Sequence, residues 1–296
     1  MVAVPEAVPV SAPPASRRTP SQLMVRIGSA IVIIPVCLAA VAAGTLSTSV
    51  LFGVVLTAAL VEFYLITRSR GNGAAPWVLF PLAYLFFYRF QLGTWAQQVV
   101  AGGITVAVGA GLAIFLLGRP LVDAMSRWAL AVAGALYLGW MLGFYMALYT
   151  ARQPDPGHVG FAWIIALVGS TIIGDTSALL FGSWLGRHPF FPGISPKKTV
   201  EGAAAGFVMQ TLTFSAFGLF AEVPLPHVVV LGALVAVAAQ AGDLIESQFK
   251  RAAGVKDAST LIPGHGGMLD RLDSLVLVPA VAYYYLTLVL HVRLPQ

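Results

Sequence analysis

Two acidic clusters in the sequence have a spacing that places their carboxylates on shared helix faces. The first lies in an apolar run and consists of Asp243, Glu246, Ser247 and Lys250. Positions i, i+3, i+4 and i+7 lie on one side of an α-helix, so these four side chains face the same way. The second cluster is the pair Asp270 and Asp273, at i and i+3 at the start of the last apolar run.

Carboxylates on adjacent helices repel one another unless cations neutralise them. Hard oxygen ligands with room for water suit Mg²⁺. If packing brings the two faces together, the clusters predict a Mg²⁺ site, and a second cation, monovalent or divalent, is left open.

The loop between the clusters is rich in polar residues and glycine. It carries Lys256, Asp257, His265, Gly266, Gly267 and Arg271. Glycine lets a backbone approach a ligand closely. By spacing alone, salt bridges at a membrane surface fit these charges as well as a phosphate site does. His265 has no second His or Cys at ligand spacing, which argues against zinc.

A second polar segment, "GISPKKTVEGAAAG" (193–206), has the character of a phosphate site. Ser195 followed by Pro196 predicts a helix N-cap and first helical residue. Free N–H groups there, with Lys197 and Lys198 beside them, would bind phosphate; the alternative is a capped helix whose lysines only set topology. Neither G-x-x-x-x-G-K-[ST] nor G-x-G-x-x-G occurs, so a P-loop or dinucleotide fold is not supported. Together the parts suit phosphoryl or nucleotidyl transfer at a membrane surface.

The elements that must position these residues are membrane helices. The 296 residues are 58% hydrophobic and 10% charged, against about 25% charged in a soluble domain. The composition predicts an all-α, polytopic helical bundle. We expect about nine transmembrane spans, at 27–44, 47–67, 75–93, 95–118, 127–149, 159–184, 200–221, 227–249 and 272–292.

The chain divides into a tail and one membrane domain. Residues 1–21 are rich in Pro, Ala, Val and Ser and predict a disordered tail; residues 22–296 form the integral catalytic domain. A cytoplasmic N-terminus places most of the 17 basic residues on the inner side. The net charge of +5 then reflects topology and anionic lipid, not nucleic acid. We expect a cell-membrane protein whose active site faces the cytoplasm.

Some carboxylates fall inside the predicted spans. Asp175 and Glu62 join Asp243 and Glu246 in this group. A charge near mid-bilayer costs at least ~2.5–3.5 kcal/mol, so each is a functional candidate unless it is paired within the bundle. Glu62 has no evident partner in the sequence, and its role stays open.

The segment Ser247–Asp273 resembles the signature of phosphatidate cytidylyltransferases, also called CDP-diacylglycerol synthases. That pattern runs S-x-x-K-R, four residues, K-D, a short spacer, then H-G-G-x-x-D-R-x-D. Every fixed position is filled here, by Ser247, Lys250, Arg251, Lys256, Asp257, His265, Gly266, Gly267, Asp270, Arg271 and Asp273. "GDLIES", "SPKKTVEG" and "GDTSALLFG" look like further family blocks, so the motifs cover about 174–273. Leu179 departs from the aromatic residue of many relatives.

The resemblance implies transfer of CMP from CTP to phosphatidic acid with Mg²⁺. It implies metal ligation by Asp243 and Asp270, then by Asp273 and Asp175. It implies that phosphates are held by Lys197, Lys198, Lys250, Arg251, Lys256 and Arg271, with His265, Gly266 and Gly267 shaping the nucleotide pocket. Ser195, Thr199 and Glu201 look positional or phosphate-contacting. Asp243, Asp270, Asp273, Lys250 and Arg251 are the predicted catalytic set.

Two other functions are compatible with parts of the pattern. A CTP-dependent polyprenol kinase would transfer the γ-phosphate to a lipid alcohol and release CDP. An ion-coupled transporter would use Asp175, Asp243 and Glu246 as relay carboxylates, although transporters usually show repeated halves. The expected partners are CTP, phosphatidic acid and the bilayer; a homodimer is left open.

Overall fold

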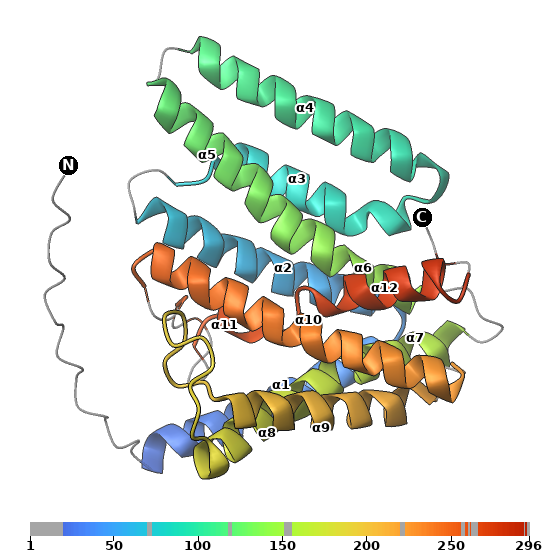
Figure 1. The fold of residues 1–296 in the computed structure, drawn as a ribbon. Helices are drawn as coiled ribbons and strands as arrows, with labels where there is room; N and C mark the ends of the chain where they lie inside the picture. Colours follow the sequence, from blue (N-terminus) through green and yellow to red (C-terminus); the bar gives the residue numbers. More distant parts are fainter. Residues whose placement is uncertain are drawn as a thin grey trace, which may run out of the picture.

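The structure, a computed structural model, describes residues 20–69, 73–117, 120–150, 156–219, 223–255, 258–259, 261, 266–292 and 294. The fold of this part is helical, apart from turns and isolated bridges (Figure 1). The α-helices are α1 (Pro20–Ala42), α2 (Thr45–Arg68), α3 (Pro76–Tyr88), α4 (Ala96–Leu116), α5 (Leu121–Gly134), α6 (Met141–Tyr149), α7 (Pro156–Ile164), α8 (Ser170–Leu185), α9 (Val200–Gly218), α10 (Leu225–Ala252), α11 (Leu269–Leu272) and α12 (Val278–Leu288). Short 3₁₀ turns η1 (Arg89–Gln91) and η2 (Gly93–Trp95) precede α4, and π-helical segments η3 (Ala135–Trp140) and η4 (Ile165–Gly169) join α5 to α6 and α7 to α8.

Five helical stretches of the described chain are long and apolar enough to cross a membrane. They are Thr45–Arg68, Gly93–Ile114, Leu121–Tyr149, Val159–Leu185 and Leu225–Ala252. Large apolar side chains such as Val106 on α4 and Leu179 on α8 are exposed, as expected for surfaces that face lipid. The part of the chain that the structure describes is therefore all-helical, and its long apolar helices indicate a multi-pass membrane protein.

The predicted count of nine spans stays a prediction. Helices α3 and α9 lie within the predicted spans at 75–93 and 200–221, but neither is among the five long apolar stretches. The predicted span 272–292 contains only the shorter helix α12, which begins at Val278. Asp273 directly follows the single turn α11 and does not lie on α12.

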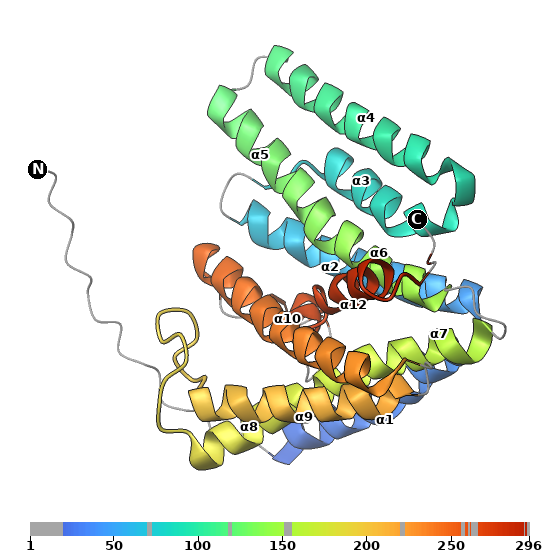
Figure 2. The ribbon, with the colours of Figure 1, turned by 45° about the vertical axis from the view of Figure 1, so that its right-hand side comes forward.

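The polar segments gather at one end of the bundle, at the left in Figure 1. Helices α8 and α10 end there, α9 starts there, and α11 and the loop between α8 and α9 lie beside them (Figures 1 and 2). Because these elements alternate in direction, segments far apart in sequence meet at this end. Lys198 precedes α9, whereas Lys250 and Arg251 fall in the last turn of α10.

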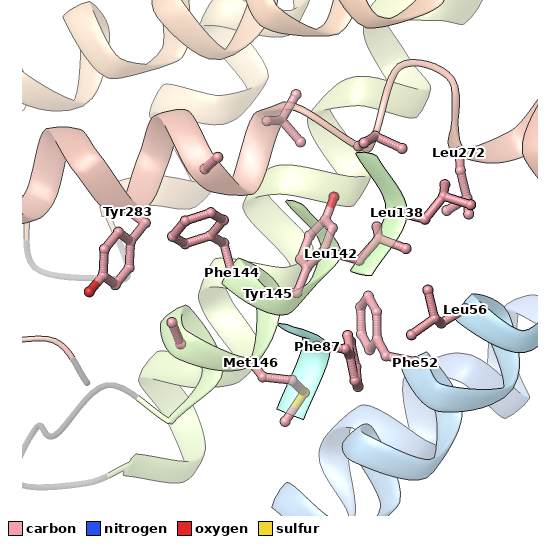
Figure 3. Close-up of a cluster of buried hydrophobic side chains, with 14 of the residues drawn as sticks. Phe52, Leu56, Phe87, Leu138, Leu142, Phe144, Tyr145, Met146, Leu272 and Tyr283 are labelled. Atoms are coloured by element: carbon pink, nitrogen blue, oxygen red, sulfur yellow. The ribbon is translucent and has the colours of Figure 1, made fainter. Parts of the chain in front are cut away.

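A buried aromatic cluster fixes the chain that follows α11. Side chains from α2, α6 and α12 point toward one another in Figure 3. The rings of Phe52 and Tyr145 lie 4.9 Å apart, as do those of Phe144 and Tyr283. The Tyr145 hydroxyl donates a hydrogen bond to the Leu275 carbonyl at 3.1 Å. The turn α11 and Asp273, which directly follows it, form the acidic turn of the site. The core therefore holds the short segment that links this acidic turn to α12.

Helices α8 and α9 approach closely because small residues face each other. A Cβ at Gly202 would lie 2.6 Å from the Ala178 carbonyl oxygen, and one at Gly206 would lie 3.0 Å from that of Gly174. Small residues at four-residue spacing let membrane helices pack backbone to backbone. The "GDTSALLFG" block thus places the helix that carries Asp175 directly against α9.

The predicted start of α9 is wrong by four residues. Thr199, not Ser195, is the N-cap: its side chain accepts a hydrogen bond from Gly202 N at 3.2 Å. The helix does not start earlier because the chain around Thr199, which is itself extended, pairs with the preceding loop: Val200 N donates to His188 O, and Phe190 N to Lys198 O. Ser195 and Pro196 lie in a turn outside the helix.

Candidate active site

Helix α10 and the acidic turn lie side by side, as the two predicted acidic faces require. The contact occurs at Gly242, where any Cβ would collide with the Asp273 carbonyl oxygen. The neighbouring Asp243 side chain therefore lies close to Asp273, and the two carboxylates act on each other electrostatically. A residue larger than glycine at position 242 would push the two carboxylates apart.

Lys250 joins the two clusters. Its ammonium lies 2.6 Å from Asp270 Oδ1 and 3.2 Å from Glu246 Oε1. All three side chains are largely buried, Glu246 almost completely. Glu246 Oε2 has no hydrogen-bond partner among the described residues. The Lys250 charge thus offsets two carboxylates in a site with little water, where the attraction is strong.

Lys198 brings the second polar segment into the same site. Its ammonium pairs with Asp243 Oδ2, which links the chain just before α9 to α10. Ser247 Oγ lies 3.5 Å from the other oxygen of Asp243. Both partners of the Lys198–Asp243 pair are about one-quarter exposed, so this pair lies nearer to solvent than Lys250 does.

Two lysines neutralise part of the acidic charge at this site. The sequence predicts that the carboxylates repel one another unless metal cations neutralise them, but in the structure Lys198 and Lys250 already offset part of their charge. Lysine and aspartate alternate across the site. Such a surface presents ammonium groups to phosphate oxygens and carboxylates to a cation at the same time.

Asp175 reaches the site from α8. It is hydrogen-bonded to the Ser274 side chain and lies within electrostatic range of Asp243, Lys198 and Arg271. Ser274 follows Asp273 directly, and its backbone N–H donates to Asp273 Oδ1 at 2.7 Å. Carboxylates from α8, α10 and the acidic turn are thereby collected from three separate stretches of chain.

Asp270 organises the loop as well as pairing with Lys250. Its Oδ2 accepts hydrogen bonds from Ala258 N at 2.9 Å and from Gly267 N at 3.1 Å. Gly266 has a φ of +85°, a conformation that favours glycine. The two glycines of the H-G-G signature thus shape the turn that brings the loop onto Asp270.

The carboxylate oxygens of the site are suitable ligands for Mg²⁺, but they do not by themselves complete a coordination shell. No group of three Asp, Glu, His or Cys side chains among the described residues is placed to hold a metal ion. Mg²⁺ usually keeps several waters and is held by one or two carboxylates together with substrate phosphates. Asp243 and Asp273, with Asp175 nearby, meet that need for oxygen ligands.

The other predicted site residues are exposed, bonded to the loop before α9, or outside the described part of the chain. Lys197, Arg251 and Arg271 are exposed at the same end of the bundle. Glu201 serves the loop before α9: it bonds His188 Nδ1 at 2.6 Å and accepts from the N–H groups of Arg187 and His188. Lys256, Asp257 and His265 lie outside the described residues.

The sequence patterns do not indicate Tyr137 as a residue of the site, and they assign no role to Glu62. Tyr137, on the π-helical segment η3, has a buried hydroxyl without a hydrogen-bond partner among the described residues, in electrostatic range of Glu246, Asp273 and Asp243. A π-helix has no sequence signature that would have pointed to it. Glu62 was noted for its charge, but its partners are mainly backbone N–H groups, which no side-chain pattern reveals.

Comparison with known proteins places this arrangement in a family. The model of the cytidylyltransferase family matches residues 24–289. A phosphatidate cytidylyltransferase of Bacillus subtilis is 32% identical over 214 residues, which cover 70% of this chain and 78% of that protein. Proteins of the same name from Staphylococcus saprophyticus and Staphylococcus aureus are 31% and 32% identical over 188 residues, 63% of this chain and 69% of each relative. The chain belongs to the cytidylyltransferase family.

Proposed function

We propose that the chain transfers CMP from CTP to phosphatidic acid and forms CDP-diacylglycerol and pyrophosphate. The family and the names of the relatives support this activity. The structural observation that carries it is the alternation of Lys198, Asp243, Lys250 and Asp270 at the end of the bundle where α9, α10 and α11 meet. Such a surface binds a triphosphate and a lipid phosphate better than an apolar or purely acidic one.

The reaction needs positioning more than proton transfer. An oxygen of the lipid phosphate attacks the α-phosphorus of CTP, the bond from that phosphorus to the bridging oxygen breaks, and pyrophosphate leaves. A phosphate monoester has a second pKa near 6 and is largely a dianion at neutral pH. A general base is therefore unnecessary, and the protein must hold two polyanions in line and offset their charge.

The carboxylates and the basic residues of the site have different roles in this reaction. Asp243 and Asp273, with Asp175, would hold Mg²⁺, which when bound neutralises phosphate oxygens. Lys198 and Lys250 donate to the phosphates, and their ion pairs with Asp243 and Asp270 keep the ammonium groups oriented before substrate binds. Exposed Lys197, Arg251 and Arg271 extend the positive surface toward incoming CTP.

The location of the site supports a cytoplasmic orientation at the cell membrane. Lys198, Lys250 and Arg251 stand at the same end of the bundle as the site. Positive residues favour the cytoplasmic side of a membrane. CTP is a highly charged nucleotide that would reach the site from water, while phosphatidic acid enters from the adjacent leaflet.

The test uses purified protein in detergent with phosphatidic acid and CTP labelled at one phosphorus. With α-label, we expect labelled lipid; with γ-label, we expect labelled pyrophosphate and unlabelled lipid. EDTA should stop both, and added Mg²⁺ should restore them. A polyprenol kinase would instead place γ-label in a lipid alcohol and release CDP. That result, or no turnover of phosphatidic acid with Mg²⁺ present, would contradict the proposal.

A further inference from the structure

Glu62 is a buried carboxylate on α2, a helix far in sequence from the region of the motifs. Its side chain is almost fully buried, with 2% of its surface exposed. Neither lysine nor arginine is its partner among the described residues. A buried carboxylate without hydrogen bonds is costly in a membrane protein, so the contacts that Glu62 does make explain why it can lie there.

Among the described residues, the hydrogen-bond partners of Glu62 lie between Ser259 and Leu269, in the loop that carries the family signature. Ser259 Oγ donates to Glu62 Oε1 at 2.6 Å, and Met268 N donates to the same oxygen at 2.8 Å. Leu269 N donates to Glu62 Oε2 at 2.8 Å. The two N–H groups stand where the turn α11 begins and have no partner within that turn. Helix α2 thus supplies the acceptor that the start of α11 lacks.

Gly267 shows how closely the loop approaches this carboxylate. A Cβ at position 267 would lie 2.8 Å from Glu62 Oε2 and 2.9 Å from the Ala258 Cβ. The other side of the same residue is held by Asp270, whose Oδ2 accepts from Gly267 N. The loop is therefore clamped between two carboxylates, one from α2 and one from α11 itself.

We propose that Glu62 is a positioning residue for the active site. By fixing Met268 and Leu269, it sets the position of Asp270, which in turn pairs with Lys250. Glu62 itself has no place among the phosphate-binding groups. Its effect on turnover rests on the proposed function, but its effect on the order of the loop does not.

Glu62→Gln is the variant that tests this role with least change in shape. A glutamine offers one carbonyl oxygen, so its NH₂ group must face either Leu269 N–H or the donors of Met268 and Ser259. We expect hydrogen exchange in a peptide that covers Met268 and Leu269 to be at least 10-fold faster than in the wild type. We expect kcat/KM for CTP to fall about 10²-fold, as for a loop displaced by about 1 Å.

A matched control lies on the same helix. Thr57 bonds the Gly53 carbonyl at 2.7 Å and contacts Tyr84, away from the loop. Thr57→Val removes a polar contact of α2 and should leave both the exchange of the loop and kcat/KM unchanged. Ser259→Ala removes a single donor to Glu62; we expect a smaller change in the same direction, which keeps the test valid if Glu62→Gln does not fold.

The outcomes separate the possible roles. Faster exchange confined to the loop, together with reduced kcat/KM, supports positioning. Wild-type exchange in the loop for both Glu62→Gln and Ser259→Ala would overturn it, as would a lower unfolding temperature with full kcat/KM per folded molecule. If the wild-type chain does not turn over CTP and phosphatidic acid, the proposed function fails, while faster loop exchange still supports the assignment of Glu62.

Discussion

The Lys250 ammonium lies 2.6 Å from Asp270 Oδ1, so the end of α10 is tied directly to the turn α11. The same ammonium lies 3.2 Å from Glu246. Lys250 is thus the link between an acidic face on a long membrane helix and an acidic turn twenty residues later in the chain. The properties of the site depend on this link in ways that can be measured.

Lys250→Gln should lower both activity and stability. Removing the ammonium leaves the carboxylates of Glu246 and Asp270 buried without their cation, and breaking a buried pair costs on the order of 3 kcal/mol. We expect a lower midpoint of thermal unfolding in detergent and a loss of turnover of more than about 10²-fold. The double variant Lys250→Gln/Asp270→Asn should recover part of the stability and none of the activity. An unchanged midpoint for Lys250→Gln would contradict the buried pairing.

Lys198→Gln should separate activity from stability. The Lys198–Asp243 pair is about one-quarter exposed, more than the Lys250–Asp270 pair, and the contribution of an ion pair to stability falls as its exposure to solvent rises. The free energy of unfolding should therefore change less than in Lys250→Gln, while turnover falls steeply because the ammonium is proposed to hold a phosphate. A chemical unfolding curve and a rate assay on the same preparation check both. Normal turnover would contradict the proposed phosphate-binding role of Lys198.

The two candidate caps of α9 make opposite predictions. Thr199→Ala removes the hydrogen bond that Gly202 N donates to its side chain, which should cost about 1 kcal/mol of unfolding free energy. Thr199→Ser should keep most of it. Ser195→Ala should leave the unfolding free energy nearly unchanged, since Ser195 lies in a turn outside the helix. Equal losses for Ser195→Ala and Thr199→Ala would place the cap where the sequence first suggested.

The close packing of α8 and α9 should not tolerate a single methyl group. Gly202→Ala would place a Cβ 2.6 Å from the Ala178 carbonyl oxygen, and such overpacking costs about 1–3 kcal/mol. Gly102→Ala on α4 is the control, because nothing lies within 4 Å of its added Cβ. It should be neutral or stabilising by up to about 1 kcal/mol. Thermal unfolding of both variants in one detergent tests the difference.

The sequence predicted the helical class and the shared helix face of Asp243, Glu246 and Lys250 because these signals are local. The i, i+3, i+7 spacing of Asp243, Glu246 and Lys250 needs only a helix, and α10 spans all three positions. Hydropathy located most of the helices for the same reason, although the last helix begins at Val278 and not at residue 272. Where a helix begins was harder: Thr199 caps α9 because the chain before it pairs with the preceding loop, and that contact depends on tertiary structure.

Other features could not be predicted from side-chain types. Glu62 binds two backbone N–H groups and a hydroxyl from residues some two hundred positions away. Every residue except proline carries such an N–H group, so no pattern in the sequence singles out these donors. The neutralisation of Asp243 by Lys198 also required knowing that α9 starts where α10 approaches its end.

Asp243 is proposed to act on the substrate phosphates by holding a divalent cation, and Asp243→Asn tests this role with the fewest side effects. Asp270→Asn is less clear because Asp270 also holds Ala258 and Gly267. The measurement is transfer of α-label from CTP to phosphatidic acid across a range of Mg²⁺ concentrations, with unfolding followed in parallel. We predict a folded protein with turnover reduced at least about 10²-fold, and partly recovered at high Mg²⁺. Wild-type turnover with the wild-type dependence on Mg²⁺ would contradict it.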